Sequence, residues 1–86
     1  MKLYSVPFNW DSISEDIDTN TIFQLMENNG VEFIDGGGHS HDDVHGNFTQ
    51  LANFFQELDG PAQSFPIDEF KEWVELYEVD ENRIPV

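Results

Sequence analysis

The distribution of charge constrains the fold of this chain more than any other feature of its sequence. Between Leu3 and Phe70 there are thirteen aspartates and glutamates but no lysine or arginine. Salt bridges are therefore nearly impossible through most of the chain, and repulsion between carboxylates destabilises any compact state. Disordered acidic tails are poor in aromatic residues, whereas 14% of the residues in this chain are aromatic. We therefore expect a folded domain that depends on apolar burial.

The net charge also restricts the partners that the protein can bind. The 86 residues carry a formal charge of −15, with Lys2, Lys71 and Arg83 as the cations. Nucleic acids and anionic membranes both require cations on the protein, so neither is expected as a direct partner. A basic protein surface, above all a nucleic-acid-binding site, is the favoured partner. Without cysteines, a signal peptide or a membrane-spanning run, residues 1–86 are expected to form one cytoplasmic domain.

Alternation and helical periodicity predict an α+β fold, with three helices packed on a sheet of two or three short strands. Residues 2–8 alternate as in a strand, and residues 31–34 read as a second short strand. A short helix is expected over 19–28, because Asp18 or Thr19 can cap its start and Asn29-Gly30 supplies a left-handed residue that can end it.

A second helix is predicted from an apolar period in the middle of the chain. Steps of four, three, four and three residues connect Val44, Phe48, Leu51, Phe55 and Leu58. This period predicts an amphipathic helix from about His41 to Asp59, which would tolerate Gly46 at a cost of roughly 1 kcal/mol.

The segment PIDEFKEWVELYEVDE, residues 66–81, predicts a third helix with two distinct stripes. Its apolar stripe consists of Ile67, Phe70, Val74 and Tyr77. Its acidic stripe consists of Glu69, Glu72, Glu75 and Glu78. Carboxylates three residues apart repel each other by a few tenths of a kcal/mol per pair, so helix stability alone would favour lysines among them. We interpret the acidic stripe as a binding surface; the alternative is a solvated face that keeps the protein soluble.

Further residues are expected to support such a surface. The supporting acidic residues are Asp68 on the same helix and Asp11, Glu15, Asp16 and Asp18 near the first helix. Trp10 and Trp73 are candidate interface anchors, because tryptophan is enriched among the residues that dominate binding energy. The alternative for Trp10 is a ring that lies over the edge of the core.

All three histidines, His39, His41 and His45, lie within seven residues and beside two aspartates. Imidazole and carboxylate groups suit a divalent transition metal, and His41 and His45 would share one face of the predicted helix. HSHDDVH resembles the HxHxDH motif of the metallo-β-lactamase-like hydrolases, but Val44 separates its last two ligands and the chain is short for that fold. The alternative is a polar helix start whose imidazoles soften the acidic charge near pH 6. We expect neither a catalytic metal nor an enzyme.

Three functions follow from these features. The first is a small inhibitor that blocks the nucleic-acid site of a basic protein, as phage anti-defence proteins, DNA mimics and nuclease immunity proteins do. The order strand, helix, loop and a helix entered through HGNFTQLANFF resembles the barstar family of ribonuclease inhibitors, although the C-terminal half departs from it. The second function is a metal- or pH-responsive module built on HSHDDVH. The third is an acidic adaptor that binds through the Trp73–Leu76 edge of the last helix.

Overall fold

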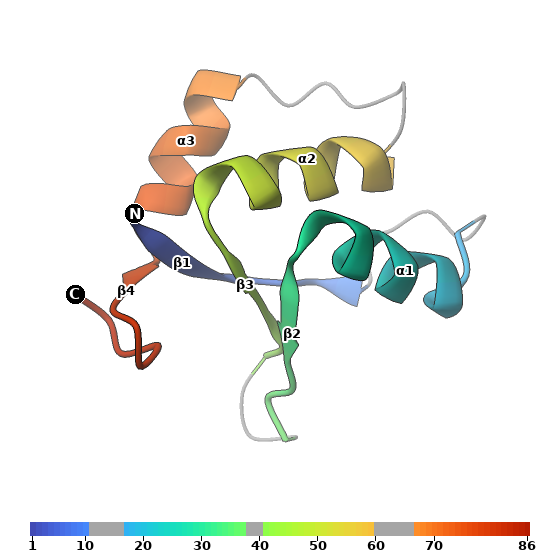
Figure 1. The fold of residues 1–86 in the computed structure, drawn as a ribbon, viewed down its shortest axis with the longest axis horizontal. Coiled ribbons are helices and arrows are strands. Elements are labelled where there is room, and N and C mark those ends of the chain that lie inside the picture. The colour runs from blue at the N-terminus through green and yellow to red at the C-terminus, as the bar shows by residue number, and fades with distance from the viewer. Residues whose placement is uncertain (11–16, 38–40, 60–66) are drawn as a thin grey trace.

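A computed structural model describes residues 1–10, 17–37, 41–59 and 67–86 of the chain (Figure 1). These residues form three helices and one four-stranded antiparallel sheet. In chain order the elements are β1 (Leu3–Pro7), α1 (Thr19–Asn29), β2 (Glu32–Ile34), β3 (Asp43–Gly46), α2 (Phe48–Asp59), α3 (Ile67–Glu75) and β4 (Glu78–Val79). The α+β class is therefore confirmed, with a larger sheet than the two or three strands expected.

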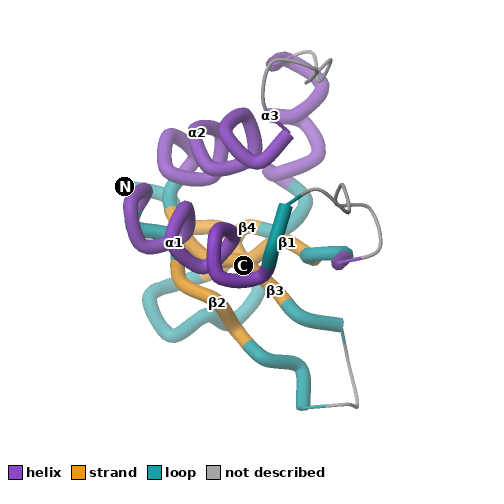
Figure 2. Tube along the Cα trace, turned by 90° about the vertical axis from the view of Figure 1, so that its right-hand side faces the viewer, coloured by secondary structure: helices purple, strands orange, loops and turns teal. Residues whose placement is uncertain are grey.

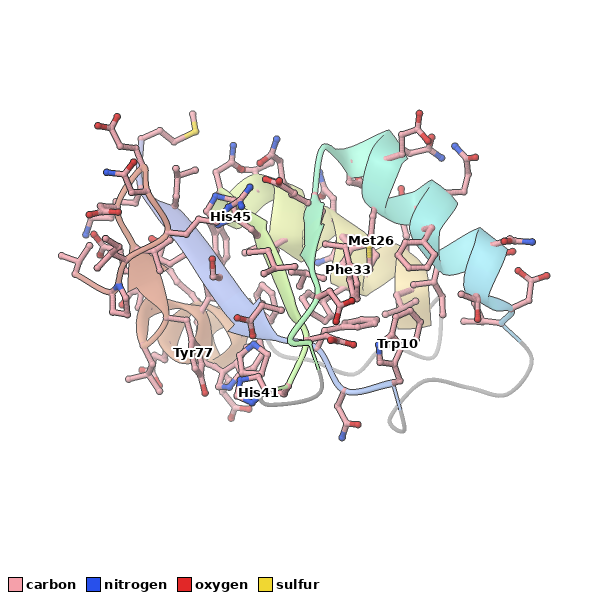
Figure 3. All side chains as sticks on the ribbon, turned by 90° about the horizontal axis from the view of Figure 1, so that it is seen from below. Trp10, Met26, Phe33, His41, His45 and Tyr77 are labelled. Carbon is pink, nitrogen blue, oxygen red and sulfur yellow. The ribbon has the colours of Figure 1, made fainter. Side chains whose placement is uncertain are left out.

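In the part of the chain that the structure describes, the helices cover one face of the sheet and leave the other face without a helix. The strand order is β2-β3-β1-β4, and each neighbouring pair is antiparallel. Val44 pairs with both Val6 and Phe33, so these side chains share one face. The helices lie on that side of the strands in Figure 1, and Figure 2 shows the same layering after a quarter turn. Figure 3 looks onto the opposite face, which we call the open face.

The core lies between the covered face of the sheet and the central helix α2, which contacts both α1 and α3. The largest fully buried side chains are Phe54, Leu51, Val6, Val44 and Val74. Among the described residues no polar or charged side chain is buried. This arrangement fits the expectation that apolar burial must stabilise a chain so short of salt bridges.

Helix α1 agrees closely with the helix expected over 19–28. The Asp18 side chain accepts a hydrogen bond from the Thr21 amide at 2.7 Å, which satisfies one amide of the first turn. Gly30 ends the helix at φ +70°, a conformation that glycine adopts without strain. Among the described residues, no helix has the length and apolar character needed to cross a membrane.

The prediction of one helix from His41 to Asp59 is wrong, because its first third forms strand β3. Val44 satisfies the strand period as well as the helical one, and the strand pairs with β1 on one side and β2 on the other. Helix α2 begins after Asn47, whose side chain accepts from the Gln50 amide while Gln50 accepts from the Asn47 amide, both at 2.9 Å. This reciprocal capping box starts the helix after the strand has ended.

The third helix is shorter than predicted and ends at Glu75. The chain then turns through Leu76 and Tyr77, and the Tyr77 carbonyl accepts a hydrogen bond from the Ser5 amide at 3.0 Å. Pairing with β1 therefore takes the place of the last helical turns. Beyond β4 the chain turns back, so that Pro85 forms an isolated bridge with Val79.

Candidate functional site

Helix α3 presents an exposed acidic surface, as the sequence predicted for its first part. Phe70 and Val74 turn into the core and leave the opposite side of the helix to solvent. Four carboxylates occupy that side, and all are exposed: Asp68, Glu69, Glu72 and Glu75. We call these residues the acidic face of α3. Lys71 is also exposed on this helix.

Glu78 does not belong to this surface, so the four-glutamate stripe predicted for one helix is corrected to three glutamates. It lies on β4, opposite Tyr4 of β1, and its side chain is half-buried. One carboxylate oxygen of Glu78 lies 3.6 Å from the Lys2 ammonium. The stripe breaks because strand pairing with β1 replaces the helical spacing after residue 75.

Of the acidic residues expected to support the stripe, Asp68 lies on α3 itself, whereas Asp18 does not lie beside this helix. Asp18 caps α1, and Figure 1 places α1 and α3 at opposite ends of the helix layer. Hydrogen bonds from the Thr21 amide and hydroxyl lower the pKa of Asp18. Asp18 therefore stabilises the start of α1 as its N-cap. The other three predicted acids, Asp11, Glu15 and Asp16, lie outside the described residues.

Both tryptophans pack against the core instead of standing free on the surface. Trp73 is half-buried between α2 and α3, with its ring centroid 6.3 Å from that of Phe55 and 5.5 Å from that of Tyr77. Trp10 is also half-buried and stacks edge-on against Phe8 at 4.9 Å. The alternative interpretation of Trp10, a ring over the edge of the core, describes its position.

The histidines do not share a helix face, so that prediction is wrong. His45 lies on β3 and points to the open face, while His41 lies in the segment before this strand (Figure 3). His41 is exposed, with Nε2 at 3.5 Å from Asp43 Oδ1. Within the described residues no three metal-binding side chains are grouped to hold an ion. His39 lies outside those residues.

The open face brings together a pair that sequence reasoning missed. Ser5 of β1 and His45 of β3 are directly opposite each other, with Ser5 Oγ at 2.7 Å from His45 Nδ1. Glu32 is the partner of His45 on the other side and forms an ion pair with Arg83. Forty residues separate Ser5 from His45, so only the strand register could have revealed the pair. Both are half-buried on a sheet face without a covering helix, and we interpret the pair as a cross-strand contact that stabilises the sheet.

The cations of the chain do little to neutralise its acidic surface. Two of them, Lys2 and Arg83, form ion pairs with Glu78 and Glu32, one at each edge of the sheet. The third is Lys71 of α3. Among the described residues, the carboxylates that form ion pairs with these cations are therefore those of Glu78 and Glu32.

No protein-family model matches the chain, and neither a curated protein nor a solved structure matches it significantly. The resemblances to the metallo-β-lactamase-like hydrolases and to the barstar family therefore remain expectations.

Proposed function

We propose that this protein is a small acidic inhibitor that binds the positively charged nucleic-acid-binding surface of a partner protein. The observation that supports this proposal is the acidic face of α3, whose four carboxylates are all exposed. The partner would belong to one of three classes: a nuclease that an immunity protein neutralises, a host defence protein that a phage protein inhibits, or a regulator that a DNA mimic inhibits. The protein would act with this partner in the cytoplasm.

The spacing of the carboxylates on α3 is compatible with competition against a nucleic acid. From Asp68 to Glu75 the helix rises about 10 Å at about 1.5 Å per residue. Over the same length, one strand of a DNA duplex presents about three phosphates, at about 3.4 Å each along the axis. Four carboxylates on one side of α3 therefore provide a similar density of negative charge.

The net charge of −15 supports rapid recognition of a basic partner. A negative electrostatic field attracts a positively charged protein as the two diffuse together. At low salt this attraction raises the association rate constant towards about 10⁸–10⁹ M⁻¹s⁻¹. Because Lys2 and Arg83 are held in ion pairs at the sheet edges, the field over α3 is reduced mainly by Lys71.

The test is displacement from immobilised DNA. Basic proteins of the source organism are bound to DNA-cellulose at about 50 mM salt and challenged with the purified protein. We expect the wild type to release a discrete protein that mass spectrometry identifies. The double variant Glu72→Lys/Glu75→Lys should release at least about tenfold less of this protein. It replaces two carboxylates of the acidic face with lysines, whose positive charges repel the basic partner.

A matched control carries the same change in net charge elsewhere. Glu27→Lys/Glu81→Lys alters two exposed carboxylates, one on α1 and one in the C-terminal turn. This control should still release the partner. Equal release by both double variants, or by polyglutamate at the same charge concentration, would assign the effect to bulk charge and reject the acidic face of α3 as the site.

One observation favours the adaptor as a second candidate function. Leu76 follows directly after the acidic face and is 77% exposed, although it is a large apolar residue. An adaptor that binds through Leu76 and the neighbouring Trp73 would hold its partner by apolar contact. Its binding would be insensitive to salt and to Glu72→Lys/Glu75→Lys, but would be lost in Leu76→Ser.

A further inference from the structure

Three aromatic side chains from separate parts of the chain form a patch on the side of the molecule away from α3. Trp10 follows β1, Phe23 lies on α1 and Phe33 lies on β2. Their ring centroids are 5.8 Å apart for Trp10 and Phe23, 5.9 Å for Trp10 and Phe33, and 5.3 Å for Phe23 and Phe33. Figure 3 shows Trp10 and Phe33 together beneath α1, far from Tyr77. We call these three residues the aromatic patch.

The patch is accessible from solvent. Phe23 is 40% exposed, while its helix neighbours Ile22 and Met26 are 2% and 3% exposed and hold α1 on the core. Trp10 and Phe33 are half-buried beneath it. Phe23 thus adds little to the core, and its ring packs on Trp10 and Phe33 at the surface. Together the three rings form a contiguous apolar surface, the kind of feature that marks an interaction site.

A carboxylate is fixed at the edge of the patch. The Trp10 indole Nε1–H donates to Asp42 Oδ2 at 2.8 Å, and the Gly36 amide donates to Asp42 Oδ1 at 2.9 Å. These two hydrogen bonds lower the pKa of Asp42, with that from Gly36 as the larger cause. Asp42 therefore stays ionised at neutral pH, and its negative charge lies against the edge of the Trp10 ring.

We propose that the aromatic patch, together with Asp42, binds an arginine side chain of the basic partner. This inference rests on the proposed function, because it concerns the same basic partner. A guanidinium group stacks on aromatic faces and forms hydrogen bonds with carboxylates, whereas an ammonium group is a strongly hydrated point charge. The net charge of −15 attracts either cation, but ring faces beside a fixed carboxylate discriminate in favour of arginine. The patch therefore specifies the kind of cation, while the acidic face of α3 responds to charge alone.

The experiment compares two defined probes, a nona-arginine peptide and a nona-lysine peptide, at about 50 mM salt. Titration calorimetry on the wild-type protein should show that nona-arginine binds about three- to fivefold more tightly, the size expected for an exposed cation–π contact. Phe23→Ser should bring the two affinities together by weakening the binding of nona-arginine alone. Leu76→Ser, which removes an exposed apolar residue outside the patch, should keep the preference.

The location of the contact is checked by fluorescence in a Trp73→Phe background, where Trp10 is the one remaining tryptophan. Nona-arginine should change the Trp10 emission more than nona-lysine at equal saturation. Equal affinities of the two peptides for the wild type, an arginine preference that survives Phe23→Ser, or an unresponsive Trp10 would each overturn the assignment to the patch.

The two proposals can fail separately. If the wild-type protein releases no protein from DNA, the inhibitor proposal fails, whatever the peptides show. If displacement depends on the acidic face of α3 while the two peptides bind equally, the inhibitor proposal stands and the arginine site is rejected.

Discussion

His45 illustrates how a residue predicted for one purpose is placed for another. Its side chain is half-buried on the open face, within hydrogen-bond distance of Ser5 and beside the ion pair of Arg83 and Glu32. Burial, followed by the positive charge of Arg83, lowers the pKa of His45 below its ordinary value of 6.5, and Glu32 opposes this shift. The folded protein therefore favours the neutral imidazole.

This environment predicts a loss of stability on mild acidification. The unfolded chain takes up a proton at His45 as the pH falls through about 6.5, while the folded protein resists it until a lower pH. The stability that neutral His45 contributes is therefore complete above about pH 6.5 and declines as the pH falls towards the folded pKa. Melting temperatures of the wild type and His45→Gln should differ most at about pH 7.5 and approach each other near pH 5.5. A difference that does not vary with pH would show that His45 titrates alike in both states.

At the scale of single elements, the junction between β3 and α2 depends on the capping box. Asn47 and Gln50 satisfy each other's backbone amides, and the Leu51 amide donates to the Asn47 carbonyl at 3.0 Å as the helix begins. Gly46 leaves space for Gln50, because a Cβ at Gly46 would lie 2.9 Å from Gln50 Oε1. The glycine at the end of β3 therefore leaves room for the Gln50 side chain that caps the start of α2.

Asn47→Ala should lower the free energy of unfolding by about 1 kcal/mol, the usual cost of removing a helix cap. Asn53→Ala is the matched control, since Asn53 is exposed within the same helix and alanine is a better helix former. Urea unfolding followed by circular dichroism measures both. If the two variants had equal free energies of unfolding, strand β3 alone would determine where α2 begins.

At the scale of the whole molecule, self-repulsion is the main cost of the sequence. The molecule measures about 35 × 31 × 21 Å and carries a charge of −15. At about 10 mM salt the Debye length is about 30 Å, so carboxylates on all sides repel one another, whereas at about 1 M it is about 3 Å. The melting temperature should therefore rise with sodium chloride over this range.

Lowering the net charge should weaken this salt dependence. A fourfold variant with Glu27, Glu72, Glu75 and Glu81 changed to Lys has a net charge of −15 + 8 = −7. Differential scanning calorimetry should show a smaller rise in melting temperature with salt for this variant, and a higher melting temperature at low salt. An equal salt response in both proteins would indicate that salt acts through burial of apolar surface instead of charge screening.

Local signals predicted those parts of the fold that depend on neighbouring residues. The alternation in β1, a cap at Asp18 or Thr19 and an end of α1 at Asn29-Gly30 are all read within a few residues. The structure confirms the alternation, and it shows Asp18 as the cap and Gly30 as the left-handed residue. The acidic face of α3 was also predictable, because Phe70 and Val74 mark the buried side of the helix. The predictions failed at β3 and β4, where the apolar positions fit a helical period as well as a strand.

The sequence by itself determined the large negative charge, the dependence on apolar burial and the exposure of the carboxylates on α3. Tertiary structure decided that residues 43–46 and 78–79 are strands, because their backbone groups find partners on β1 at a distance of about forty or more residues in the chain. It also separated Asp18 from α3 and assembled Trp10, Phe23 and Phe33 into one patch. Periodicity reports which side of an element is buried, whereas pairing between distant strands determines which element forms and what lies beside it.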